Sequence, residues 1–308
     1  MKILLAGATG AIGRRLLPAL GRDNHEVIAL TRDPSRAAEF RRSGVQAVVA
    51  DALDRTELLR ATDGVEFDAV IHQLTALTKP PVRHRGMAVT NLLRTDGTRH
   101  LLEVAERAGA RRFVTQSIVF GYGYIDHGSR SLTEDAPFGR PTGGPTAPHI
   151  AAMATNEELV LGSSALEGIA LRYGLFYGGD PDPLPDLLRA RKVPVTSGPD
   201  RPLAWIHLDD AVTATVAALD RGRPGQAYNI VDDVPASWRS VITAAAAAHH
   251  APSPPVLPGF LIKLAAPYVA AMLNASLRVS NDRAAEELGW RPSHPGFTDG
   301  IRASVVGS

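Results

Sequence analysis

The sequence predicts an α/β protein with a doubly wound parallel sheet and a smaller C-terminal lobe. A glycine-rich turn directly follows the first apolar run, and short apolar runs then alternate with helical segments through the first half. The second half is richer in proline and less regular. The chain has 308 residues, 44% of them hydrophobic, which is enough for one large core or for a main domain with a lobe.

The first predicted element is a buried strand over residues 3–6, followed by the glycines Gly7, Gly10 and Gly13. These glycines let the backbone approach a pyrophosphate, and the next helix points its free N–H groups at that negative charge. The turn therefore predicts a Rossmann-type dinucleotide site; the alternative is a tight strand-to-helix turn without a ligand. The predicted contacts are Gly7, Thr9, Gly10, Ala11, Ile12 and Gly13.

The following elements complete the expected sheet. Residues 92–107 carry apolar side chains at helical spacing, and Gly109 ends that helix. A further helix is expected around residues 155–162. The apolar runs that predict the other parallel strands are residues 26–30, 47–50, 69–72, 112–116 and 168–173.

The shift in composition after Gly178 predicts the domain organisation. We expect residues 1–178 to form mainly a Rossmann-type doubly wound parallel sheet, and residues 179–308 to form mainly a smaller C-terminal substrate-binding lobe. Residues 203–231 are expected to return to the sheet.

Composition and charge exclude several classes of protein. The formal net charge is +1, from 33 basic and 32 acidic residues, so we expect no nucleic-acid partner. The chain has no cysteine, which excludes disulfides, thiolate zinc sites and cysteine nucleophiles. The first strand begins at Lys2, which leaves no room for a signal peptide, and the apolar residues 260–273 are fewer than the roughly 20 that span a membrane. We therefore expect a cytoplasmic protein without a membrane partner.

Several motifs occur in a specific order along nearly the whole chain. They are the glycine turn of residues 7–13, Asn91 with Gly97-Thr98, and the segments 171–178 (Leu-Arg-Tyr-Gly-Leu-Phe-Tyr-Gly), 205–210 (Trp-Ile-His-Leu-Asp-Asp) and 288–292 (Leu-Gly-Trp-Arg-Pro). In this order the chain resembles the extended short-chain dehydrogenase/reductase superfamily, which includes nucleotide-sugar epimerases, dehydratases and related reductases. The resemblance implies a nicotinamide cofactor, a small-molecule substrate, and a monomer or a homodimer formed through helices near residues 92–107 and 151–162.

The end of the second strand bears on the choice of cofactor. An NAD enzyme usually offers a carboxylate there to the ribose 2′-hydroxyl. Here Thr31 stands at that position, and Arg32, with Arg36, could bind a 2′-phosphate through charge-assisted hydrogen bonds. We therefore expect NADP, with NAD as the less favoured cofactor. The alternative is that Arg32 is a solvated residue at the helix entry and Asp33 binds the ribose.

The resemblance implies further cofactor contacts. Asp51, Ala52 and Leu53 would lie at the adenine, although Asp51 is equally suited to cap a helix. Gln73, Leu74 and Thr75 would run past the ribose, and Tyr173 would lie near the carboxamide.

The catalytic centre departs from the family that the chain resembles. In that family a Tyr and a Lys lie four residues apart, and a Glu follows the Lys by four. Aligning that Glu with Glu157 places Met153 at the Lys position and His149 at the Tyr position. A thioether has neither a charge nor a proton to donate. His149 is thus the candidate proton donor, with an exposed histidine at a helix start as the alternative.

Other polar residues are candidates for the same centre. Gln116 stands at the position of the family's Ser or Thr, and Ser117 beside it either contacts substrate or caps backbone groups. Tyr122 and Tyr124 either reach the nicotinamide or form pocket walls.

The group of His207, Asp209 and Asp210 is not expected to bind metal, because no second histidine or acidic ligand stands at helical spacing beyond it. We expect Asp209 or Asp210 to be a helix N-cap with His207 packed beneath, and Trp290 to fill the core of the smaller lobe.

These features favour an NAD(P)-dependent oxidoreductase that acts on a small organic, apolar or secondary-metabolite substrate with a non-standard proton donor. A redox-neutral epimerase, isomerase or lyase and a non-catalytic NADP-binding regulator remain the alternatives. Residues 252–273 slightly favour a hydrophobic, uncharged substrate, although ordinary packing of the lobe explains them equally well. A nucleotide sugar would instead use the cations Arg189, Arg191, Lys192 and Arg201.

Overall fold

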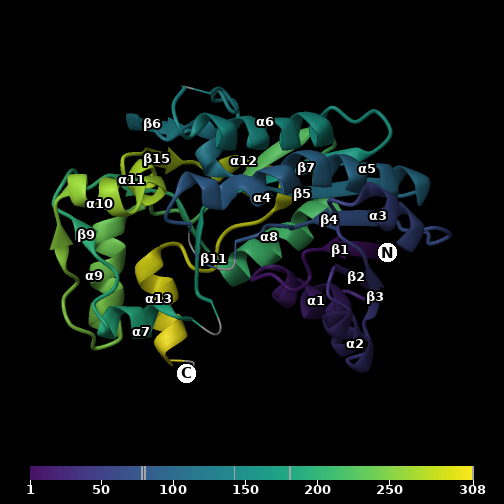
Figure 1. The fold of residues 1–308 in the computed structure, drawn as a ribbon, viewed down its shortest axis with the longest axis horizontal. Helices are drawn as coiled ribbons and strands as arrows, with labels where there is room; N and C mark the ends of the chain where they lie inside the picture. Colours follow the sequence, from purple (N-terminus) through teal and green to yellow (C-terminus); the bar gives the residue numbers. More distant parts are fainter. Residues whose placement is uncertain (78, 80, 142, 180–181, 307–308) are drawn as a thin grey trace.

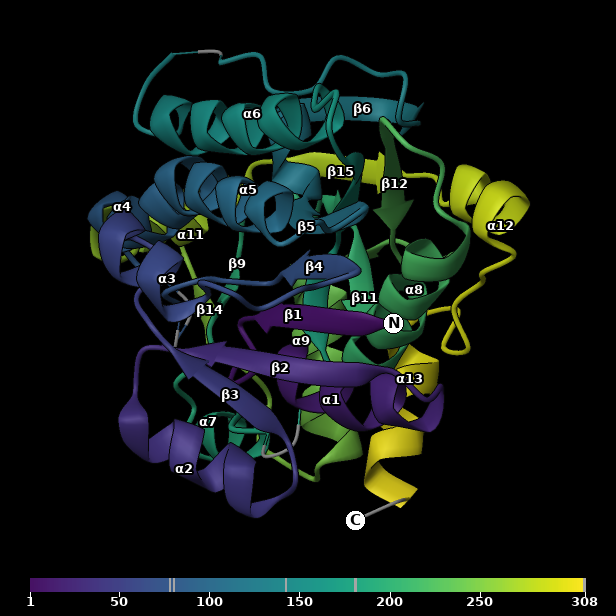
Figure 2. The same cartoon turned by 90° about the vertical axis from the view of Figure 1, so that its right-hand side faces the viewer.

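The computed structural model describes residues 1–77, 79, 81–141, 143–179 and 182–306, with side chains as far as residue 301. These residues form a seven-stranded parallel sheet in the order β12, β7, β5, β4, β1, β2, β3 (Figure 1, Figure 2). This confirms the predicted α/β fold. The strands are β1 (Lys2–Ala6), β2 (Glu26–Thr31), β3 (Gln46–Val49), β4 (Ala69–His72), β5 (Arg112–Ile118), β7 (Glu167–Tyr173) and β12 (Gln226–Ile230).

The strand order reverses at β1. The chain passes from β1 outward through β2 and β3, then returns to β4 on the other side of β1 and continues to β5 and β7. Ligands of such sheets bind outside the carboxyl ends of the strands where the order reverses. In this chain that point is the end of β1 and β4, where Ala6 pairs with His72.

Both faces of the sheet are covered by helices. Along β1, Ile3 and Leu5 pack into one hydrophobic cluster, and Leu4 and Ala6 pack into another. This alternation is the two-residue period of a strand that is buried on both sides. One face carries α1 (Gly13–Arg22), α2 (Pro34–Arg42), α8 (Leu208–Arg221) and α12 (Asp282–Leu288); the other carries α3 (Arg55–Ala61), α5 (Thr98–Arg107) and α6 (Ala147–Leu161).

Two helices differ from the predicted ranges. The single helix expected over residues 92–107 is interrupted: α4 (Ala88–Leu92) leads into a π-helical turn (Leu93–Gly97) before α5 begins. Helix α6 begins at Ala147, earlier than predicted, because Pro148 fits the first turn of a helix. The earlier start places His149 inside α6, which packs against the π turn.

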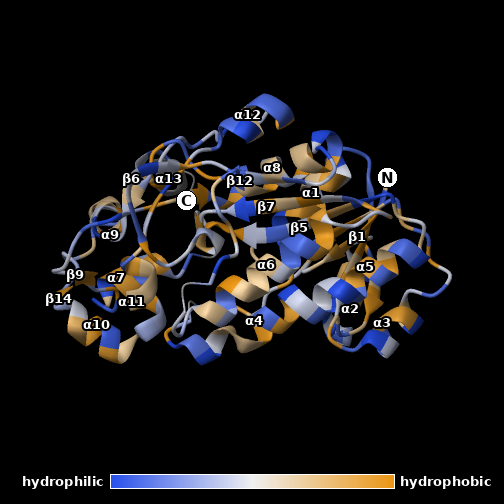
Figure 3. Cartoon of the chain, turned by 90° about the horizontal axis from the view of Figure 1, so that it is seen from above, coloured by the Kyte–Doolittle hydropathy of each residue, from blue (hydrophilic) through white to orange (hydrophobic). Residues whose placement is uncertain are grey.

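The remaining elements build the lobe at the end of the molecule opposite α2 and α3 (Figure 3). Its core contains Trp205, Tyr268 and Phe297. No described helix is long and apolar enough to cross a membrane. The short paired strands are β6 (Asp126–Leu132) with β15 (Ser276–Val279), β8 (Leu175–Tyr177) with β11 (Trp205–His207), β9 (Val195–Thr196) with β14 (Val256–Leu257), and β10 (Pro202–Leu203) with β13 (Ala236–Ser237). The helices are α7 (Leu184–Arg189), α9 (Trp238–Ala248), α10 (Gly259–Ala265), α11 (Pro267–Leu273) and α13 (Phe297–Val306), with 3₁₀ turns at His84–Met87 and Val119–Tyr122.

Candidate active site

The turn between β1 and α1 requires glycine for steric reasons. Gly7 has φ +99°, and a Cβ there would lie 2.6 Å from the carbonyl oxygen of Gln73. A Cβ on Gly13 would lie 2.1 Å from the carbonyl oxygen of Gly7. The tip of the turn, Thr9 to Ala11, is exposed. A tight turn with an open tip at the start of a helix fits the pyrophosphate of a dinucleotide.

Among the residues after β2, some side chains already form hydrogen bonds or ion pairs within the protein, and others do not. Asp33 is the N-cap of α2. The Ser35 hydroxyl and, at 2.9 Å, the Ser35 N–H both donate hydrogen bonds to its carboxylate, and these bonds lower the pKa of Asp33. Arg36 forms an ion pair of 2.7 Å with Glu39. Arg32 is exposed, and within the described part of the chain no hydrogen bond or ion pair engages its side chain. Among these described side chains, the Arg32 guanidinium is therefore the cation available to a ligand at this strand end. The neighbouring Thr31 hydroxyl accepts a hydrogen bond of 3.2 Å from the Asp33 N–H.

The predicted contacts after β3 and β4 lie at the same edge of the sheet. Asp51 accepts a hydrogen bond of 2.9 Å from the Leu53 N–H, and Ala52 between them is buried. The suggestion that Asp51 caps a helix is wrong, because Asp54 is the N-cap of α3.

The segment after β4 carries an unpartnered polar atom. Gln73 is buried, and its Nε2 donates a hydrogen bond of 3.2 Å to the Tyr173 hydroxyl, whereas its Oε1 has no partner among the described residues. Leu74 and Thr75 follow it and are half-buried. Tyr173 is fully buried, and its hydroxyl also lies 2.6 Å from the Thr215 hydroxyl, so the protein interior occupies this hydroxyl.

A buried ion pair between Arg172 and Glu157 forms hydrogen bonds with two of the predicted catalytic hydroxyls, those of Ser117 and Tyr122. Arg172 and Glu157 pair at 2.7 Å, and Ser117 donates a hydrogen bond of 2.6 Å to the same carboxylate. Tyr122 accepts from Arg172 at 2.9 Å and donates to Asn229 at 2.8 Å, and burial raises the pKa of Tyr122 to about 12. The geometry therefore argues against catalytic roles for Ser117 and Tyr122, since both hydroxyls are committed inside the protein.

His149 lies in a cluster of rings rather than at the surface, which corrects the alternative of an exposed histidine. It is 3% exposed, and its Nδ1 accepts a hydrogen bond of 3.0 Å from the Asn91 amide. Its Nε2 lies 3.1 Å from Nδ1 of His84, which fits a proton on Nε2 that is donated to His84. Burial is the main cause that lowers the pKa of His149 to about 4, and the nearby His84 and Arg94 contribute to the same shift. At neutral pH the imidazole is uncharged.

Two tyrosines complete this cluster. The Tyr124 and Tyr268 hydroxyls lie 3.1 Å apart, and the Tyr268 ring contacts both His84 and His149 at centroid distances of 5.6 Å. Burial raises the pKa of Tyr124 well above its ordinary value, so the hydroxyl is neutral. Sequence reasoning found Tyr124 and His149 but missed His84, Arg94 and Tyr268, because only the tertiary fold brings these segments together.

The residues that the sequence places at the family's Lys position and at its Ser or Thr position, Met153 and Gln116, are uncharged. Met153, at the Lys position, is 1% exposed and packs in the core of the lobe. Gln116, which the sequence places at the Ser or Thr position, is half-buried near the carboxyl end of β5, and its side chain makes no hydrogen bond within the described residues.

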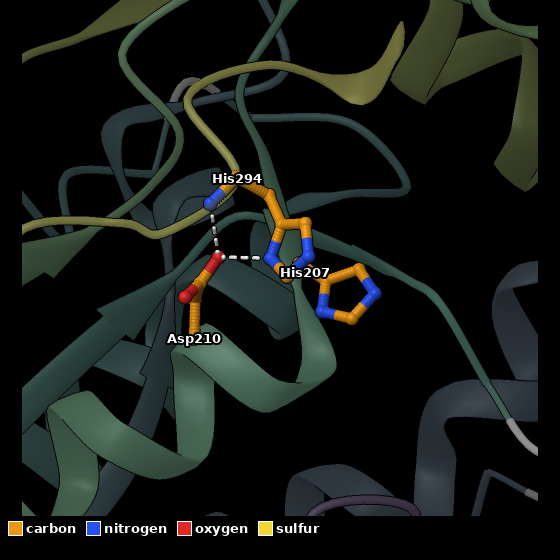
Figure 4. A group of neighbouring side chains, drawn as sticks. All are labelled: His207, Asp210 and His294. Carbon is orange, nitrogen blue, oxygen red and sulfur yellow. Dashed lines mark hydrogen bonds and ion pairs between the residues drawn. The ribbon is translucent and has the colours of Figure 1, made fainter. Parts of the chain in front are cut away.

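A second polar cluster joins His207, Asp210 and His294 (Figure 4). Asp210 accepts hydrogen bonds from both the backbone N–H and the side chain of Ser293 and of His294, at 2.5–3.0 Å. These four donors occupy the carboxylate, so the cluster ties residues 293–294 to α8. His207 itself is the N-cap of α8, accepting from the Asp209 N–H at 3.2 Å, so the prediction that Asp209 or Asp210 caps this helix is wrong.

Trp290 also differs from its prediction. It packs in the hydrophobic cluster that contains α1 and α8, not in the core of the lobe, and its indole N–H donates to Thr213 at 2.9 Å.

The fold and the glycine turn define a dinucleotide-binding protein of the doubly wound type. A family model described as "NAD dependent epimerase/dehydratase family" matches residues 3–231. The chain belongs to this family, within the extended short-chain dehydrogenase/reductase superfamily, and several of its relatives are enzymes.

Relatives of known activity include two reductases. The chain is 41% identical to the 3-diazoavenalumate denitrifying reductase of a Streptomyces species over 98% of this chain and 99% of that protein. It is 28% identical to the 2-alkyl-3-oxoalkanoate reductase of Stenotrophomonas maltophilia over 82% of this chain and 77% of that protein. Among solved structures, the Thermus thermophilus UDP-glucose 4-epimerase in complex with NAD has a TM-score of 0.78 and 25% identity, covering 99% of this chain and 98% of that one. These similarities support an NAD(P)-dependent enzyme of the oxidoreductase and epimerase group.

Proposed function

We propose that this chain is an NADP-dependent reductase that replaces an aromatic diazo group with hydrogen and uses no general acid. The observation that carries the proposal is the pair of residues at the family's Tyr and Lys positions: a histidine whose pKa is lowered to about 4, and a buried methionine. The Streptomyces relative that is 41% identical supports the substrate class. Its printed name, 3-diazoavenalumate denitrifying reductase, describes a substrate that is both a diazo compound and an anion.

The chemistry of diazo reduction explains why such a site has no acid. A carbonyl that accepts hydride becomes an alkoxide, which a Tyr–Lys pair must protonate. A bound reduced nicotinamide would supply hydride to the carbon of an aryl diazonium group; a C–H bond forms, and the C–N bond breaks with its electron pair leaving in N₂. Because hydride provides both electrons and the hydrogen, the balanced reaction consumes no proton. A neutral His149 and Met153 are then sufficient.

The side chains around the turn favour NADP as the reductant. The loop from Gly7 to Gly13 would bind the pyrophosphate, and Arg32 is the exposed, unengaged cation for a 2′-phosphate. Asp33, the alternative ribose ligand, is occupied as a helix cap. The Oε1 atom of Gln73 offers a buried acceptor after β4.

The lobe gives weaker support for a nucleotide sugar. Of the cations that could bind its diphosphate, Arg189 already pairs with Asp186 at 3.0 Å and Arg201 with Asp126 at 2.9 Å. The side chains around His149 are instead aromatic rings, which suit a planar organic substrate.

The test is the stoichiometry of the reaction with 4-diazobenzoate. We expect one NADPH oxidised, one N₂ released and one benzoate formed per substrate, at a rate well above that of the reaction without protein. NADPH oxidation without N₂ release would contradict the proposal. Turnover of a nucleotide sugar without net cofactor consumption would instead support the redox-neutral alternative.

A further inference from the structure

Arg94 is a buried cation without a counterion. It lies in the π turn between α4 and α5 and is 5% exposed. Its Nη1 atom has no hydrogen-bond partner, and its guanidinium forms no ion pair with any residue that the structure describes. Arginine stays protonated even when burial lowers its pKa, as it does here. Among the described residues, nothing therefore compensates this positive charge in the interior.

Another buried arginine, Arg172, makes the contrast clear. Arg172 is 6% exposed, but its guanidinium pairs with the Glu157 carboxylate at 2.7 Å and bonds the Tyr122 hydroxyl. A buried charge without such partners is costly to the folded state. An unpaired arginine at the same depth is explained if an anion from outside the chain completes its environment.

The surroundings of Arg94 show what kind of anion this would be. The titratable groups that act electrostatically with it are the Tyr124 and Tyr268 hydroxyls and the His149 and His72 rings; none of them is acidic at neutral pH. The two tyrosines use one hydroxyl hydrogen between them, so the other is left to donate to a ligand. A guanidinium and a hydroxyl donor match a carboxylate.

The same cluster provides flat surfaces for an aromatic body. The His84 and His149 rings are joined by a hydrogen bond with their planes at 9° to each other, and the Tyr268 ring lies at a steep angle to both of them. π-helical turns occur frequently at functional sites, and this one places Arg94 opposite the start of α6, where His149 lies.

We propose that Arg94, with Tyr124 and Tyr268, binds the carboxylate of a planar aromatic substrate and positions it beside His149. The inference rests on the proposed function, whose substrate class it narrows. It also replaces the sequence-based preference for an uncharged substrate with one for an aryl carboxylate.

The test compares cinnamate with cinnamamide, its neutral analogue, by calorimetric titration of protein saturated with NADP⁺. We expect cinnamate to bind more tightly than cinnamamide to the unmodified protein. In Arg94→Met, cinnamate should bind about 10- to 100-fold more weakly with little change for cinnamamide, and Arg94→Lys should recover part of the loss. NADPH affinity, measured for each variant, reports whether the sheet domain has folded.

A second readout separates a binding role from a structural one. Because Arg94→Met removes an unpaired buried charge, the ligand-free variant should melt at the same or a higher temperature than the unmodified protein, and cinnamate should no longer raise it. Equal binding of cinnamate and cinnamamide to the unmodified protein, or unchanged cinnamate binding in Arg94→Met, would overturn the proposal.

Different results would contradict the proposed diazo reduction and the proposed carboxylate site. Cinnamate has no diazo group, so its selective binding depends on Arg94 and not on the reaction. If 4-diazobenzoate is not reduced while cinnamate selectivity depends on Arg94, the diazo reductase is wrong and the carboxylate site stands. If 4-diazobenzoate is reduced equally well by Arg94→Met, with unchanged KM, the carboxylate site is wrong and the reductase stands.

Discussion

The Nε2 atom of His149 lies 3.1 Å from Nδ1 of His84, and the planes of the two rings are nearly parallel, at 9°. Because burial is the main cause that lowers the pKa of His149 to about 4, the imidazole is a neutral hydrogen-bonding group at working pH rather than a proton donor.

An NMR titration of the His149 ring should give a midpoint near pH 4, and Arg94→Met should raise it, since Arg94 is one of the charges that disfavour the imidazolium. The folded-state pKa lies below the ordinary 6.5, so this site contributes stability above pH 6.5. That contribution, up to about 3 kcal/mol, is lost as the pH falls from about 6.5 to about 4. A midpoint near 6.5 would contradict the burial of His149.

Cofactor preference should depend on Arg32. Arg32→Ala should weaken NADPH binding about 10- to 100-fold and leave NADH binding nearly unchanged, because only NADPH carries the 2′-phosphate. Nicotinamide fluorescence titrations measure both. Arg36→Ala is the matched control and should have a smaller effect, since Arg36 is paired with Glu39. A larger loss for NADH than for NADPH would instead point to Asp33 as the ribose ligand.

The glycine turn offers a comparison within one helix. Gly13→Ala places a Cβ 2.1 Å from the Gly7 carbonyl oxygen, so the turn must shift and dinucleotide binding should be lost. Gly21→Ala, later in α1, meets nothing within 4 Å. It should stabilise the protein by about 0.5–1 kcal/mol and leave NADPH binding intact. Equal NADPH affinity in both variants would rule out the turn as the pyrophosphate site.

Glu157 should be important for folding. Glu157→Gln leaves Arg172 without its buried counterion and should cost about 3–5 kcal/mol in the free energy of unfolding, measured by urea denaturation. The neighbouring Glu158 is exposed, and Glu158→Gln should change stability by less than about 0.5 kcal/mol. If both variants are equally stable, the buried network of Glu157, Arg172 and Ser117 does not hold α6 to the sheet.

Local patterns predicted six of the seven described parallel strands, because each of the six contains a short apolar run, and they predicted the dinucleotide turn, because its glycines lie close together in the sequence. Helix caps were harder to predict. His207 caps α8 where Asp209 was expected, and Asp54 caps α3 where Asp51 was considered, because side-chain geometry that the sequence does not show decides which residue caps. The alignment on Glu157 places His149 and Met153 at the family's Tyr and Lys positions, and this assignment stays a prediction. The surroundings of His149 come from segments distant in the sequence: α11, the π turn and a 3₁₀ turn. No local sequence pattern predicts that these segments contact one another.

Isotope tracing of the hydrogen that enters the product tests the central claim most directly. The reaction of 4-diazobenzoate is run with NADPH deuterated at the nicotinamide C4 in H₂O, and with unlabelled NADPH in D₂O. We predict benzoate with one deuterium at the former diazo carbon in the first case and none in the second, because hydride alone forms the new C–H bond. Deuterium from D₂O at that carbon would show that a proton donor takes part and would contradict a reductase without a general acid.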